Sequence, residues 1–172
     1  MTRGRVSRNG LTGLGLASLV VVLIADQASK WWILDRLHLP ALGRVDLAPM
    51  LSFTMVWNPG VTFGLFRAGG AWGPFLLTAV AVAIVVALAA WLRRAENPLV
   101  AISLGMIAGG AVGNVTDRMR FGAVVDFIHF HVGTWSWYVF NVADAAIVCG
   151  VAALVLDGLW PRSRTEDHVA GS

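Results

Sequence analysis

Hydrophobic and polar positions divide the chain into four long apolar segments separated by more polar stretches. The apolar segments run from Gly10 to about Leu34, from Pro74 to Leu92, from Pro98 to about Arg118, and from about Trp137 to Leu156. About 20 apolar residues in helical form cross a hydrocarbon core of about 30 Å. The pattern therefore predicts a mainly α membrane protein with four transmembrane helices.

The first apolar segment must be distinguished from a cleaved secretory leader, because arginines precede it at positions 3, 5 and 8. A cleavage site requires small residues in an A-x-A pattern, and none is well placed after the run. Apolar character instead resumes from Trp31 to Leu34. These features favour a retained first helix.

The stretch from about residue 38 to 73 is too polar and too rich in glycine and proline to span a membrane. Leu51, Phe53, Met55 and Trp57 recur with a period of two, which is typical of a half-buried strand. A turn follows over residues 58–60. We expect a small extracytoplasmic sheet here, an extracytoplasmic loop or short helix at about 119–136, and a flexible polar cytoplasmic tail at 161–172.

Glycines at positions 105, 109 and 113 form a ridge along the third helix. Such ridges let helix backbones approach closely in lipid. The lone Cys149 cannot form an internal disulfide, and buried packing is the role we expect for it.

Composition agrees with a membrane protein of one domain, residues 1–160. Only 13% of the 172 residues are charged, about half the share found in soluble domains. The small excess of 13 Lys and Arg over 10 Asp and Glu lies in tails and short loops. This placement favours membrane lipids as partners, and no module for nucleic acid is visible.

The polar clusters all fall on one side of the membrane if the four helices alternate in direction. They lie at the ends of the first and third helices, in the loop between the first two, and at the start of the fourth. The opposite side carries seven Lys and Arg in short segments, and the polar side carries six in longer loops. The positive-inside rule then places both termini in the cytoplasm.

Two carboxylates in apolar surroundings, Asp126 and Asp144, are the candidates for catalysis. Ionisable groups at a membrane are costly, so their presence is a functional hypothesis by default. When two such groups lie close together they share one proton, as in aspartic proteases. Asn141, Asn114 and Arg118 could orient the pair or hold substrate carbonyl groups.

Several structural alternatives remain open. Asp117 could simply satisfy a backbone group at the helix end or pair with its neighbour Arg118, and Asp26 with Lys30 could be an i,i+4 pair at the interface. A metal site of two histidines at 129 and 131 with Asp126 is disfavoured, because the histidines would face one side of an extended segment and Asp126 the other. A proton-coupled transporter predicts polar groups throughout the bundle, whereas here they cluster on one side.

Five motifs resemble the conserved boxes of lipoprotein signal peptidase, also called signal peptidase II. They are the sequences at residues 26–30, 57–60 with 63–64, 109–118, 125–127 and 140–144. The resemblance covers residues 10 to about 160. It departs from the family pattern at Val61 and Thr62, where small residues are common.

The resemblance implies four transmembrane helices with an extracytoplasmic β-cradle and a short surface helix. It implies a bacterial inner-membrane aspartic protease, without cofactor or metal, that removes signal peptides from diacylglyceryl-modified prolipoproteins just before the lipidated cysteine. We expect the enzyme to work as a monomer. Asp126 and Asp144 match the catalytic pair, and eight residues match supporting or substrate-contacting positions: Asp26, Lys30, Asn58, Gly110, Asn114, Arg118, Asn141 and Ala143.

Overall fold

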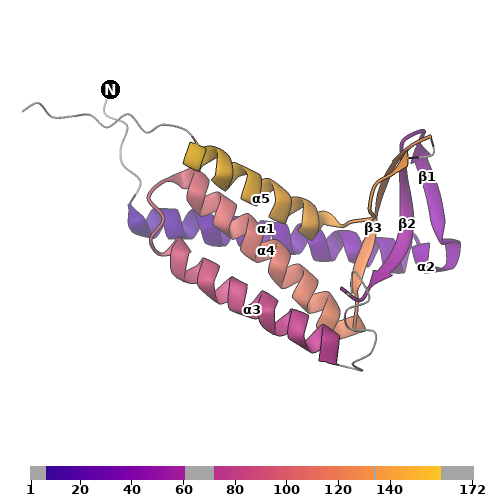
Figure 1. Ribbon diagram of the computed structural model, residues 1–172, viewed down its shortest axis with the longest axis horizontal. Coiled ribbons are helices and arrows are strands. Elements are labelled where there is room, and N and C mark those ends of the chain that lie inside the picture. Colours follow the sequence, from indigo (N-terminus) through magenta and orange to yellow (C-terminus); the bar gives the residue numbers. More distant parts are fainter. Residues whose placement is uncertain (1–6, 61–71, 134, 160–172) are drawn as a thin grey trace, which may run out of the picture.

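The computed structural model describes residues 7–60, 72–133 and 135–159, in which a helical bundle carries a small sheet at one end (Figure 1). The long helices are α1 (Arg8–Trp31), α3 (Trp72–Leu92), α4 (Pro98–Phe121) and α5 (Val142–Leu159). A π-helical turn, η1 (Trp32–Arg36), extends α1. All four are long and apolar enough to cross a membrane, which confirms the four expected spans.

Helix α4 occupies the centre of the bundle and packs against α1, α3 and α5. Its glycine ridge explains how α1 comes so close. A Cβ atom added at Gly105 would collide with the carbonyl oxygen of Gly15, and one at Gly109 would lie 2.6 Å from the carbonyl oxygen of Leu19. The glycines at 105 and 109 therefore serve packing, as expected.

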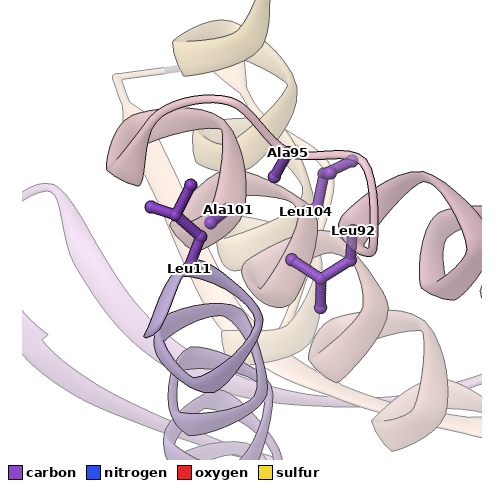
Figure 2. Close-up of a cluster of buried hydrophobic side chains, with 5 residues drawn as sticks. All are labelled: Leu11, Leu92, Ala95, Ala101 and Leu104. Carbon is purple, nitrogen blue, oxygen red and sulfur yellow. The ribbon is translucent and has the colours of Figure 1, made fainter. Parts of the chain in front are cut away.

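At the end of the bundle far from the sheet, an apolar cluster joins three helices. Figure 2 shows that its members come from α1, α3, α4 and the α3–α4 connection: Leu11, Leu92, Ala95, Ala101 and Leu104. In the same region Asn97 caps α4, because its Oδ1 accepts a hydrogen bond of 2.8 Å from the backbone N–H of Val100. This cap and Pro98 fix where α4 begins.

The outer faces of the helices expose large apolar side chains, as a lipid-facing surface requires; examples are Val21, Phe75 and Val148. The expectation that Cys149 is buried is wrong, since this residue is exposed. Helix α5 buries the face that carries Ala146 and Gly150, and position 149 lies off that face.

The sheet is antiparallel in the order β1-β2-β3-β4. Its strands are β1 (Arg44–Ala48), β2 (Leu51–Asn58), β3 (Val124–Val132) and β4 (Trp135–Ser136). A one-turn helix, α2 (Leu39–Leu42), precedes β1. The expected small sheet is confirmed. A second apolar cluster of Ile33, Leu39, Val125 and Phe127 joins the sheet to the end of α1.

Two boundaries differ from the sequence prediction. The segment 119–136, expected as a loop or helix, is mostly strand, because the β-branched and aromatic residues of β3 pair with β2 from Phe130 to Val124. Helix α5 begins at Val142 rather than near Trp137. The delay arises because the carbonyl oxygen of Phe140 accepts hydrogen bonds from the backbone of β3.

Candidate active site

Asp126 lies on β3 with only 1% of its surface exposed. Its two carboxylate oxygens accept hydrogen bonds from the side-chain amides of Asn141, at 2.7 Å, and Asn58, at 2.9 Å. Burial raises the pKa of Asp126, and the nearby negative charge of Asp144 adds to the rise, whereas the amide donors Asn58 and Asn141 oppose it; together these effects bring the pKa to about 6. Asp126 is therefore a carboxyl group that holds its proton unusually tightly.

Asp144 lies in the first turn of α5 and is partly accessible to solvent. Its Oδ1 accepts a hydrogen bond of 2.8 Å from the side-chain amide of Asn114, and its Oδ2 lies 3.4 Å from the backbone nitrogen of Asn141. The Asn141 Oδ1 accepts in return from the Asp144 backbone N–H at 3.0 Å. This reciprocal pair has the form of a capping box, so one motif both starts α5 and orients Asp144.

Asn141 and Asn114 connect the two aspartates. The Asn141 side-chain amide that donates to Asp126 also lies 3.2 Å from Asn114 Oδ1, and Asn114 donates to Asp144. Asn141 is fully buried and Asn114 nearly so. The structure thus brings Asp126, Asp144, Asn58, Asn114 and Asn141 into one hydrogen-bonded network at the sheet end of the bundle.

Beneath this network lies a buried ion cluster that joins α1 to α4. Lys30 Nζ lies 2.8 Å from Asp26 Oδ2 and 2.7 Å from Asp117 Oδ2. The Asp26–Lys30 pair is confirmed, although it is buried rather than interfacial. Pairing of Asp117 with Arg118 is wrong: neighbours on a helix point in different directions, and Asp117 faces Lys30 instead.

Gln27 belongs to this cluster and was missed as a site residue by the sequence analysis. Its Nε2 lies 3.1 Å from Asp26 Oδ2 and also 3.1 Å from Asp117 Oδ1. A signal was available, since Gln27 is an amide inside a strongly apolar helix and directly follows Asp26.

Arg118 faces the turn that follows β2. Its Nη1 donates to the Asn114 carbonyl oxygen at 3.4 Å, and its buried Nε has no hydrogen-bond partner among the described residues. A Cβ atom at Gly60 would lie 3.3 Å from Arg118 Nη2. Gly60 adopts a φ of 78°, and its N–H donates to Asn58 Oδ1. The expected departure at Val61 and Thr62 lies outside the described residues.

Gly110 and Ala143 mark the contact between α4 and the start of α5. A Cβ atom at Gly110 would lie 2.5 Å from the carbonyl oxygen of Ala143. The backbone N–H of Ala143 donates to Asp26 Oδ1 at 3.0 Å, and Ala143 is fully buried. Gly110 therefore allows the backbone of α5 to pack closely against α4, and Ala143 contributes its backbone N–H.

The family model described as signal peptidase (SPase) II matches residues 18–160. The chain belongs to the signal peptidase II family. This confirms the resemblance seen in the sequence, and it makes the protein a bacterial multi-pass membrane protease of an aspartic protease family.

Relatives and solved structures agree with this assignment. The chain is 51% identical over 159 residues to the lipoprotein signal peptidase of Methylorubrum extorquens (strain PA1), covering 92% of this chain and 93% of that protein. It is also 51% identical over 151 residues to that of Methylobacterium sp. (strain 4-46), covering 88% and 92%. Two solved structures described as a bacterial membrane enzyme superpose with TM-scores of 0.72 and 0.75 at 25% identity, covering 90% and 87% of this chain and 93% and 95% of theirs.

In this signal peptidase, His129 and His131 lie together on β3, with ring centroids 5.4 Å apart. His129 contacts Ser136 and Thr54, whereas His131 lies 3.0 Å from Arg44. Desolvation, His131 and Arg44 all lower the pKa of His129. Within the described part of the chain, no group of three or more metal-ligating side chains could hold a metal ion.

Proposed function

We propose that this signal peptidase removes the signal peptide from diacylglyceryl-modified prolipoproteins, cleaving just before the lipidated cysteine with water activated by Asp126 and Asp144. The observation that carries the proposal is that Asn141 contacts both carboxylates at once, through its side chain and its backbone. A single buried residue thus holds the two acids of an aspartic protease together.

The two acids hold one proton between them, because two adjacent carboxylates in a poorly solvated site do not both ionise. The raised pKa of Asp126 favours Asp126 as the acid that carries this proton. Asp144, which is partly accessible, takes a proton from water as the water oxygen attacks the scissile carbonyl carbon. Asp126 gives its proton to the carbonyl oxygen. As the C–N bond breaks, Asp144 gives the proton it took from water to the leaving amine and Asp126 takes back a proton from a hydroxyl of the tetrahedral intermediate, so that both acids return to their starting state and no covalent intermediate forms.

Arg118 and Asn58 are suited to hold the substrate backbone. The Arg118 guanidinium has a buried N–H without a partner among the described residues, and Asn58 contacts Asp126 directly. A buried donor without a partner is costly, and a substrate carbonyl oxygen would remove that cost. We assign these residues to substrate binding next to the catalytic pair.

The orientation that suits this function places both termini in the cytoplasm and the sheet at the extracytoplasmic surface of the inner membrane. The count of seven basic residues against six supports this orientation. A lipid-anchored substrate then reaches the acids laterally, at a level where water is available. Because one chain supplies every contact of the described network, we propose that a monomer is active.

The proposal is tested with purified enzyme and two forms of one precursor, with and without the diacylglyceryl group. We expect cleavage of the lipidated form only, with mass spectrometry placing the cut before the modified cysteine. A metal chelator should leave the rate unchanged. Equal cleavage of both forms would contradict the substrate assignment, and loss of activity with chelator would contradict the aspartate mechanism.

A further inference from the structure

Two backbone N–H groups donate to the buried ion cluster, and each belongs to the residue just before a proposed catalytic aspartate. The N–H of Val125 donates to Asp117 Oδ2 at 3.1 Å, and Asp126 follows Val125. The N–H of Ala143 donates to Asp26 Oδ1 at 3.0 Å, and Asp144 follows Ala143. The same contact is therefore made once on β3 and once on α5.

Lys30 joins the two acceptors of these bonds. Its ammonium group lies within 2.8 Å of both Asp26 and Asp117, and the Gln27 amide bridges the same pair. Asp26, Lys30 and Asp117 are exposed by 0%, 2% and 1%. Side chains buried this deeply do not touch a substrate in this conformation, so their effect on the reaction must pass through the groups they hold.

We infer that Asp117 is a positioning residue, which together with Asp26 and the shared Lys30 sets the spacing of the two catalytic carboxylates. The inference rests on the proposed function and adds a cause for its geometry. Asp126 lies on a strand and Asp144 on a helix, and the cluster links both backbones to one ammonium group. A misplacement of 1 Å can lower the rate of an enzyme by about 100-fold.

The stability of the fold does not by itself require this cluster. Replacing a buried ion cluster by apolar residues of similar volume is often neutral or stabilising, because desolvation of the charges offsets their attraction. What apolar residues cannot supply is two directed acceptors for the N–H groups of Val125 and Ala143. The two carboxylates therefore serve to position the backbones of Val125 and Ala143, and with them the catalytic acids.

The test compares Asp117→Asn and Asp117→Ala with the control Ser103→Ala. Ser103 is also buried on α4, and its hydroxyl has no hydrogen-bond partner among the described residues. We expect kcat on lipidated precursor to fall about 10-fold in Asp117→Asn, which keeps an oxygen acceptor for Val125, and about 100-fold in Asp117→Ala. We expect KM to stay within about twofold in both, and the limbs of the pH profile to shift as the coupling between the acids changes. The control should match the wild type.

Wild-type kcat and pH limbs in folded Asp117→Ala would overturn the inference. A lower yield of folded protein with unchanged kcat per folded enzyme and unchanged pH limbs would also overturn it, since that is a structural role only. If Asp117→Ala does not fold, Gln27→Leu provides the second variant, because it keeps both ion pairs and removes the amide that contacts Asp26, Asp117 and the Gly113 carbonyl oxygen. We expect a smaller loss of kcat in the same direction, and wild-type kinetics would reject the inference.

Asp126→Asn and Asp144→Asn, assayed in parallel, separate this inference from the proposed function. Full turnover by these two variants would reject the catalytic pair itself. Inactive Asp126→Asn and Asp144→Asn enzymes, alongside Asp117 variants with wild-type kinetics, would reject only the positioning role.

Discussion

The side-chain amide of Asn141 lies 2.7 Å from the carboxylate of Asp126, so the residue that starts the last transmembrane helix also orients an acid on the sheet. The same residue receives the backbone N–H of Asp144 on its side-chain oxygen. The contacts of Asn141 thus both begin α5 and bring the two acids together.

Replacing Asn141 should separate these two roles. Serine keeps an oxygen that can cap α5, whereas alanine does not, so Asn141→Ala should lose about 1 kcal/mol more stability than Asn141→Ser. Both variants lack the amide donor to Asp126 and Asn114, and kcat should fall in both by about 100-fold. Thermal unfolding in detergent and steady-state kinetics measure the two effects. Retention of wild-type kcat by Asn141→Ser would show that the amide has no role in catalysis.

The raised pKa of Asp126 gives the pH profile a definite sign. The active form carries one shared proton, and ionisation of Asp126 removes it as the pH rises through about 6. We therefore expect kcat/KM, which reports the free enzyme, to decline above about pH 6. The measurement is kcat/KM on lipidated precursor from pH 4.5 to 8. A kcat/KM that rises through pH 6 to a plateau would mean that the doubly ionised pair is the active form.

A methyl group at Gly110 should disturb the site through packing. The added Cβ would lie 2.5 Å from the carbonyl oxygen of Ala143, so the start of α5 must move, and Asp144 with it. Overpacking of this kind costs about 1–3 kcal/mol, and we expect Gly110→Ala to lose activity as well as stability. The matched control is Gly13→Ala, since nothing lies within 4 Å of a Cβ at Gly13. Equal activity of the two variants would show that the close approach is not needed.

Loss of the Lys30 charge should be strongly destabilising. Lys30→Met leaves the carboxylates of Asp26 and Asp117 buried without a counter-charge, which costs about 3–5 kcal/mol. The triple variant Lys30→Met, Asp26→Asn, Asp117→Asn removes all the charges, and it should recover most of the stability while remaining slow. Unfolding by titration with a denaturing detergent measures the stability of the single and triple variants, and turnover of lipidated precursor measures their activity. Recovery of activity together with stability would mean that the cluster only stabilises the fold.

Much of this architecture could be predicted from hydrophobic periodicity. The four spans follow from their length and apolar character, and the β2 strand from its period of two. The gathering of polar groups at one end follows from the alternation of helix direction alone. Asp126 and Asp144 were recognisable because carboxylates in apolar surroundings need a reason to be there.

The differences between the sequence prediction and the structure arise from tertiary contacts. Residues 137–140 look like the start of a helix, but Phe140 bonds to β3, so Asn141 becomes the cap instead. Local spacing offered Arg118 as the partner of Asp117, whereas the true partner, Lys30, lies 87 positions earlier in the chain. Such long-range contacts leave no local pattern in a single sequence.

The central claim is that Asp126 and Asp144 together activate water, and it is tested most directly by the turnover of Asp126→Asn and Asp144→Asn on a diacylglyceryl-modified precursor. Each variant should remain folded in the membrane and show no cleavage above background, and the double variant should be no slower than either single one. Substantial turnover by both single variants would contradict the account.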